Sequence, residues 1–116
     1  KAIARGEDIT IFGDGEQTRD FIYAGDIAAG IWAALNTQQT NAAYNMSTQT
    51  ETSLRELVNI LGNIAGRRII PKYGTERAGD IYKSMLSNAR ARRGLGWKPV
   101  IPLEEGLRRT YEHFVK

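Results

Sequence analysis

Two combinations of arginine and aspartate are the residues of this chain whose types and spacing could do chemistry. Arg19 and Asp20 are adjacent in the segment QTRDFIY, and a second arginine, Arg77, precedes Asp80 by three residues in ERAGDIYKS. A guanidinium group donates two parallel hydrogen bonds, which suits the oxygens of a diphosphate. A carboxylate beyond a glycine turn can accept hydrogen bonds from ribose hydroxyls. From spacing alone, however, a structural ion pair that holds a loop is the more common interpretation.

The surroundings of Arg19 favour a buried role for it. The Arg-Asp pair is followed at once by the apolar residues Phe21, Ile22 and Tyr23, where burial is expected. A surface hairpin does not need a charged pair in such a place. A pocket for an anionic ligand would explain it.

Several kinds of active site are absent from the sequence. There is no cysteine, which excludes a thiolate nucleophile, a disulfide framework and a cysteine metal site. Neither G-x-G-x-x-G nor G-x-x-x-x-G-K-[ST] occurs, so the common glycine-rich phosphate loops are missing too. The single histidine, His113, is expected on the surface of the last helix, because a general base needs an orienting partner. One histidine cannot build a histidine-rich metal site, so no metal ligand is expected.

The net charge of +3 allows a weak nucleic-acid alternative. Arg90, Arg92 and Arg93 lie close together in RARRGLGWK. Cations in the last turn of a helix are favoured by its dipole, and the cluster has no interleaved aromatic residues. The helix interpretation is therefore preferred, and binding to nucleic acid is not expected.

Length and composition predict one globular domain. The chain has 116 residues, of which 41% are apolar and 25% are charged. No apolar run approaches the roughly 20 residues that a membrane span requires, so no membrane association is expected. The first residues, KAIARGEDIT, lack the apolar core of a signal peptide, so we expect a cytoplasmic protein.

Short strands alternate with helices, which predicts an α/β or α+β domain without repeats. Ser53 and Glu56 form a capping box at the clearest helix start, and Gly66 ends that helix. Asp26 is expected to cap another helix that ends near Asn36. The remaining expected elements are a helix end over 1–6, strands over 7–12, 19–23, 42–46 and 67–73, a helix from Ser84 or Ser87 to Arg93, and a last helix from Pro102.

The order of these segments resembles a known family. The segments ITIFGDGEQTRDFIYAGDIAAGIWAAL, AYNMSTQTETSLREL and RAGDIYKSMLSNARARRGLGWKPVIPLEEGL are similar to the carboxyl-terminal half of extended short-chain dehydrogenases/reductases. Among these, the NAD-dependent epimerases and dehydratases of sugar nucleotides are the nearest group, with the UDP-glucose 4-epimerases as the nearest type. The likeness runs from about residue 9 to residue 111.

The resemblance implies a substrate-binding role for particular residues. In this family an amino-terminal Rossmann domain binds NAD, and a smaller carboxyl-terminal domain binds the nucleotide sugar. It implies that Ile11 and Phe12 line the nucleobase, that Arg19 and Arg77 hold the diphosphate, that Asp80 contacts the ribose, and that Ser84 limits the room for the sugar. Asp20 is expected to orient the loop rather than to touch the ligand.

The same resemblance implies that residues 1–116 are the substrate domain of a larger Rossmann-fold enzyme. None of the five tyrosines is followed four residues later by lysine, so the family's catalytic Tyr-x-x-x-Lys is missing. We therefore expect no catalytic or cofactor-binding residue in this chain; NAD would be bound by the amino-terminal half of the parent enzyme, which is expected to be a homodimer. The alternative is a non-catalytic nucleotide-binding or protein-interaction module.

Overall fold

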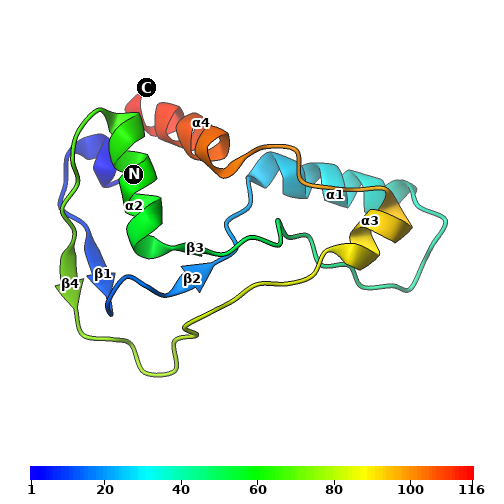
Figure 1. Ribbon diagram of the computed structural model, residues 1–116. Helices are drawn as coiled ribbons and strands as arrows, with labels where there is room; N and C mark the ends of the chain where they lie inside the picture. Colours follow the sequence, from blue (N-terminus) through cyan, green and yellow to red (C-terminus); the bar gives the residue numbers. More distant parts are fainter.

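The chain forms a small α/β structure with four α-helices and a few short strands (Figure 1). The computed structural model describes all residues from 1 to 116. In chain order the elements are η1 (Ile3–Arg5, a 3-10 helix), β1 (Thr10–Phe12), β2 (Thr18–Arg19), α1 (Ala24–Asn36), β3 (Thr52–Ser53), α2 (Leu54–Ala65), β4 (Lys72–Gly74), α3 (Ala89–Leu95) and α4 (Leu103–Val115).

The strands form two separate pairs. β1 and β4 are parallel, with Ile11 opposite Tyr73, whereas β2 and β3 are antiparallel, with Arg19 opposite Thr52. A parallel pair of strands needs a long connection between its two strands. The connection from β1 to β4 contains α2, which follows β3 and precedes β4. Helix α2 also contacts η1 and α4, so these elements gather at one end of the molecule, while α1 and α3 pack together at the other (Figure 1).

The molecule is a thin slab. Its principal extents are 48 × 36 × 16 Å and its radius of gyration is 16.4 Å, whereas a compact domain of this length has a radius of about 13 Å. Only five apolar residues are buried: Ile3, Ile11, Val58, Ala91 and Trp97. No single core therefore spans the chain, and each end has its own small cluster of buried side chains.

Both predicted ends of α2 are confirmed. The Ser53 hydroxyl accepts a hydrogen bond from the backbone N–H of Glu56 at 3.1 Å, as an N-cap should. Gly66 adopts a left-handed conformation with φ of 70° and donates its N–H to carbonyls of the last turn. The prediction that Gly6 ends the first helix is also confirmed, with φ of 73°.

All four strand predictions are wrong in extent or existence. Residues 42–46 belong to neither sheet, and most of their side chains are exposed, because no strand of this chain lies beside them. In the segment 67–73, the strand begins only after Pro71 and runs over Lys72–Gly74. Proline has no N–H to donate, and the ladder starts with the N–H of Lys72, which donates to the carbonyl of Ile9 at 2.9 Å. The strands expected over 7–12 and 19–23 are shortened to Thr10–Phe12 and Thr18–Arg19.

Asp26 does not cap its helix. Helix α1 begins at Ala24 with Tyr23 as N-cap, so Asp26 lies in the first turn. Its carboxylate accepts hydrogen bonds from the backbone N–H groups of Val100 and Ile101 at 3.1 and 3.0 Å. The side chain therefore ties α1 to the segment that leads into α4.

Helix α3 begins later than either serine predicted. Its first residue is Ala89 and its N-cap position is Asn88, which is fully buried. The Asn88 amide donates to the carbonyl of Ser47 and its Oδ1 accepts from Nε of Arg92. This asparagine joins α3 to the segment before β3.

Candidate nucleotide-binding site

A cavity of about 370 Å³ lies at the end of the molecule that contains β1 and α2. It is lined by Thr10, Ile11, Phe12, Gln17, Leu54, Leu57, Val58, Arg77 and Asp80. Residues of four separate segments meet here, namely β1, the turn between β1 and β2, the first turns of α2 and the loop after β4. Four of the residues with predicted ligand roles, Ile11, Phe12, Arg77 and Asp80, are therefore brought to one cavity.

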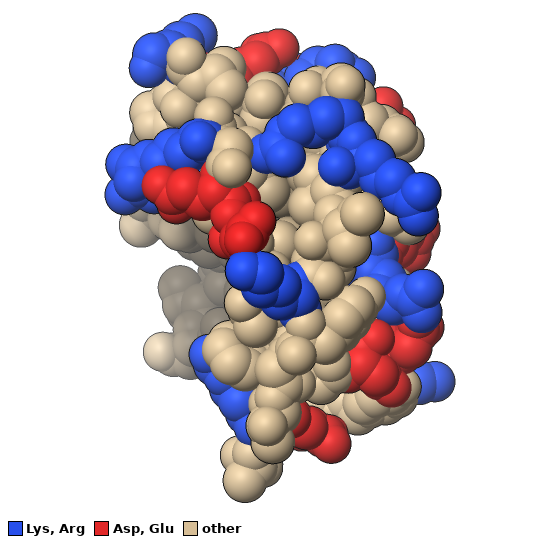
Figure 2. Space-filling model, turned by 90° about the vertical axis from the view of Figure 1, so that its left-hand side faces the viewer, with Lys and Arg blue, Asp and Glu red and all other residues tan.

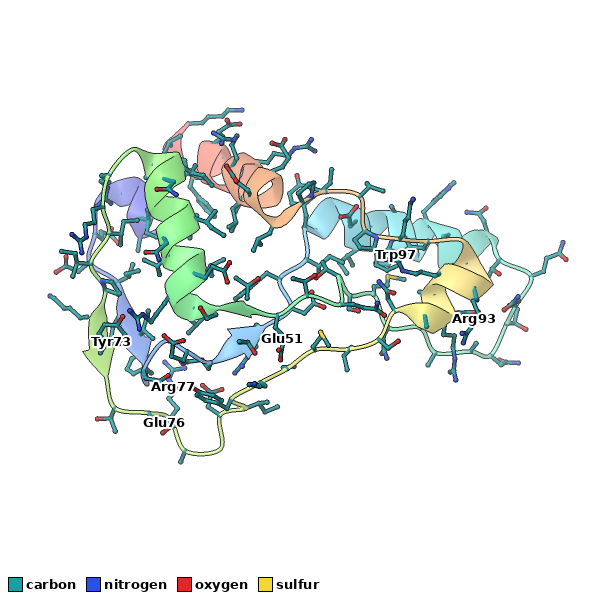
Figure 3. All side chains as sticks on the ribbon, in the orientation of Figure 1. Glu51, Tyr73, Glu76, Arg77, Arg93 and Trp97 are labelled. Atoms are coloured by element: carbon teal, nitrogen blue, oxygen red, sulfur yellow. The ribbon has the colours of Figure 1, made fainter.

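The guanidinium group of Arg77 lies over the aromatic ring of Phe12. The guanidinium carbon of Arg77 lies 4.2 Å from the centroid of the Phe12 ring, which is a cation–π contact. Figure 3 shows Arg77 beside the carboxyl end of β1, with Glu76 next to it on the same loop. A flat aromatic face at the end of a strand can also stack on a nucleobase. The guanidinium and a base would then compete for the same face.

Arg19 is connected to the cavity by its contact with Asp80, which lines the cavity. Nη2 of Arg19 lies 2.8 Å from Oδ1 of Asp80, across 61 positions of sequence, and its Nη1 donates to the carbonyl of Thr18 at 2.7 Å. The sequence suggested two local arginine–aspartate pairs, but the structure forms one long-range pair instead. The ion pair therefore links β2 to the loop after β4.

The loop after β4 is held in place by further contacts. The N–H of Thr18 donates to the carbonyl of Tyr82 at 2.8 Å, and the Tyr82 hydroxyl lies 3.3 Å from Oδ2 of Asp14. Between Arg77 and Asp80, Gly79 has φ of 78°, which suits glycine, and the N–H of Asp80 donates to the carbonyl of Arg77. This turn places both side chains on the cavity.

A second, smaller cavity of about 120 Å³ adjoins the first. Its lining consists of Gly13, Asp14, Gln17, Glu76, Asp80, Ile81 and Tyr82. Gln17 and Asp80 line both cavities, so they form the wall between them. Partial burial raises the pKa of Tyr82, and the negative charge of Asp14 adds to this effect. Gln17 is the residue that sequence reasoning missed, because a glutamine in a turn carries no motif.

Two residues from the sequence analysis lie apart from these cavities. Ser84 is half-buried and lines neither of them. Asp20 accepts hydrogen bonds from the backbone N–H groups of Thr48 and Gln49 and from the Thr48 hydroxyl. Its carboxylate holds the segment before β3, which agrees with the expected orienting role.

The surface near the candidate site carries charges of both signs (Figure 2). Basic and acidic side chains are interspersed on the face that carries β1 and β4 (Figure 2). Arg93 lies on α3, at the other end of the molecule from Arg77 (Figure 3). Arg90 donates a hydrogen bond to the Ala43 carbonyl, and Arg92 donates one to the Asn88 side chain. No group of three histidine, aspartate or glutamate side chains is placed to hold a metal ion, and no helix is long and apolar enough to cross a membrane.

Comparison with known proteins decides the family. The profile of the GDP-mannose 4,6 dehydratase family matches residues 1–110. The chain belongs to this family. Its members and structural neighbours include epimerases and dehydratases with a Rossmann fold, and this chain is similar to the UDP-glucose 4-epimerases among them.

Individual relatives within the GDP-mannose 4,6 dehydratase family are similar over nearly the whole chain. A UDP-glucose 4-epimerase of Mycolicibacterium smegmatis is 36% identical over 114 residues, which cover 98% of this chain and 36% of that protein. The crystal structure of a UDP-glucose 4-epimerase from Thermotoga maritima with UDP-glucose has a TM-score of 0.92 and 38% identity, and covers 97% of this chain. The chain therefore spans about a third of the length of these relatives.

A further structural neighbour was solved with a UDP-sugar and NAD. The UDP-glucuronic acid 4-epimerase of Bacillus cereus, in complex with UDP-glucuronic acid and NAD, has a TM-score of 0.91 and 27% identity over 97% of this chain. This chain has neither a glycine-rich G-x-G-x-x-G turn nor a Tyr-x-x-x-Lys pair. Its own residues therefore do not fit an NAD site of that kind.

Proposed function

We propose that this chain is the nucleotide-sugar-binding part of an NAD-dependent epimerase or dehydratase. In this proposal it follows a Rossmann domain that binds NAD and carries the catalytic tyrosine and lysine. The observation that carries the proposal is the 370 Å³ cavity, where Phe12, Arg77 and Asp80 meet and where Arg19 reaches Asp80 at 2.8 Å. An aromatic face, two guanidinium groups and a carboxylate are the complement of a base, a diphosphate and a ribose.

Each part of the ligand has a proposed partner. The base lies along β1 at Ile11 and Phe12, and the diphosphate accepts hydrogen bonds from Arg19 and Arg77. The ribose donates a hydroxyl to Asp80. Ser84 lies outside the cavity lining, at the place proposed for the sugar beyond the diphosphate. The relatives named for UDP-sugars support a UDP-sugar as the ligand.

The proposed contribution of this chain to the reaction is binding energy. Contacts to the nucleotide, which does not react, orient the sugar toward the cofactor of the other domain. Whether the intact protein epimerises, dehydrates or decarboxylates its sugar depends on that other domain. A homodimer is likewise a proposal for the intact protein.

The proposal is tested by calorimetric titration of the intact protein with UDP, dTDP and GDP at one salt concentration. We expect UDP to bind, and Arg77→Ala to weaken its binding about 10- to 100-fold, as the loss of a charged hydrogen-bond donor should. Because Arg77 is exposed, the free energy of unfolding should change little. Arg93→Ala, at the far end of the molecule, is the matched control. Equal UDP binding by Arg77→Ala and the wild type would refute the assignment.

A further inference from the structure

We propose that Gln17 is a ligand-binding residue whose side-chain carbonyl accepts a hydrogen bond from a ribose hydroxyl. The inference rests on the nucleotide-binding function proposed above and adds a residue to that site. Gln17 is only 7% exposed and lines both cavities. Its Oε1 is buried and has no hydrogen-bond partner.

A buried acceptor without a partner is unusual in a folded protein. Such an oxygen has lost its water, and the loss destabilises the protein unless something else donates to it. Only one other buried side-chain atom in the chain, the Tyr44 hydroxyl, is in the same situation. Tyr44 lines neither of the cavities at the candidate site, whereas Gln17 forms part of the wall of both.

The amide of Gln17 is held in a fixed orientation. Its Nε2 donates to the backbone carbonyl of Phe12 at 2.8 Å, and its own backbone carbonyl accepts from the N–H of Leu54 at 3.2 Å. The side chain folds back against Gly13, where an added Cβ would lie 3.4 Å from Nε2 and 3.6 Å from Oε1. Nε2 already donates to Phe12, whereas Oε1 has no donor, so Oε1 is the acceptor left to serve a ligand.

The position of Gln17 indicates that a ribose hydroxyl donates the hydrogen bond to its Oε1. It is bonded to Phe12, where the base is proposed to lie, and shares both cavity walls with Asp80, the proposed ribose acceptor. A ribose carries two neighbouring hydroxyls, each of which can donate one hydrogen bond. Asp80 and Gln17 together supply two acceptors for them. The site would then prefer ribonucleotides to nucleotides that lack a hydroxyl.

Calorimetric titration of the intact protein with UDP, 2′-deoxy-UDP and 3′-deoxy-UDP tests this inference. The wild type should bind UDP about tenfold more tightly than the analogue that lacks the hydroxyl facing Gln17, the value of one hydrogen bond. In Gln17→Met this preference should fall to about one, while the preference over the other analogue is kept. Gln38→Met, the same change at an exposed position, should behave as the wild type.

The results separate the inference from the function on which it rests. Failure of the wild type to bind UDP overturns both. If UDP binds and Gln17→Met weakens all three nucleotides by the same factor, Gln17 only supports β1 and the inference is wrong. If the wild type binds UDP and both deoxy analogues equally, no ribose hydroxyl meets a protein acceptor, and this result needs no variant.

Discussion

Arg19 and Asp80, which are 61 positions apart, form an ion pair with Nη2 2.8 Å from Oδ1. The pair joins the proposed phosphate-binding arginine to the proposed ribose-binding aspartate. In the free protein each of these groups is therefore the partner of the other. A nucleotide that binds here has to exchange an internal contact for two contacts of its own.

This exchange predicts the behaviour of Asp80→Asn. The amide keeps an oxygen acceptor for the ribose but removes the charge that competes with phosphate for Arg19. The intact variant should therefore bind UDP severalfold more tightly relative to uridine than the wild type does, by calorimetry. Glu16→Gln, which breaks the Arg55–Glu16 pair outside the cavity, should leave the ratio unchanged. An unchanged ratio in Asp80→Asn would mean that Asp80 does not restrain Arg19.

The buried carboxylate of Asp26 predicts a loss of stability on its removal. Asp26 is 2% exposed and accepts from two backbone N–H groups of the segment before α4. Asp26→Ala should lower the free energy of unfolding by about 2 kcal/mol, measured by urea denaturation, because these N–H groups lose a charged acceptor. Asp26→Asn keeps one acceptor and should lose less. Equal stability of Asp26→Ala and the wild type would show that water replaces the carboxylate without loss.

The raised pKa of Tyr82 predicts a loss of stability at high pH. Partial burial and the charge of Asp14 favour the neutral phenol in the folded protein. In the unfolded chain the phenol ionises near about pH 10. The contribution of Tyr82 to stability is therefore complete below that pH and is lost as the pH rises through the raised folded value. Urea denaturation from about pH 8 to about pH 11 should show a smaller decline for Tyr82→Phe. Parallel curves for both proteins would contradict the prediction.

The apolar outer face of α1 predicts that the isolated chain exposes hydrophobic surface. Ile31, Trp32 and Leu35 are 53%, 69% and 74% exposed, although their spacing is typical of a helix face that packs on other structure. The 116-residue chain should enhance the fluorescence of the dye ANS, and Trp32→Gln with Leu35→Gln should reduce it. Ile70→Gln, at an exposed position outside α1, is the control. In the intact protein the double substitution of Trp32 and Leu35 should instead lower the free energy of unfolding, because the proposed Rossmann domain would cover this face of α1.

Local signals in the sequence were sufficient for both ends of α2. Ser53 and Gly66 predict both ends of α2 because a helix end is made by hydrogen bonds among residues three to five apart. The family resemblance implied roles for Phe12, Arg77 and Asp80, and these residues do line one cavity. The sequence did not show which side chains contact one another in the fold.

Tertiary structure alone decided the contacts that cross the chain. Asp26 looked like a cap from its place before a helix, but its carboxylate binds N–H groups 74 and 75 residues away. Residues 42–46 were expected to form a strand but have no partner strand, because a strand depends on a neighbour that its own sequence does not specify. The sequence thus determined the ends of α2 and the chemical types at the site. The fold decided that Arg19 pairs with Asp80 and that Gln17 keeps an unused acceptor, because burial and pairing depend on distant residues.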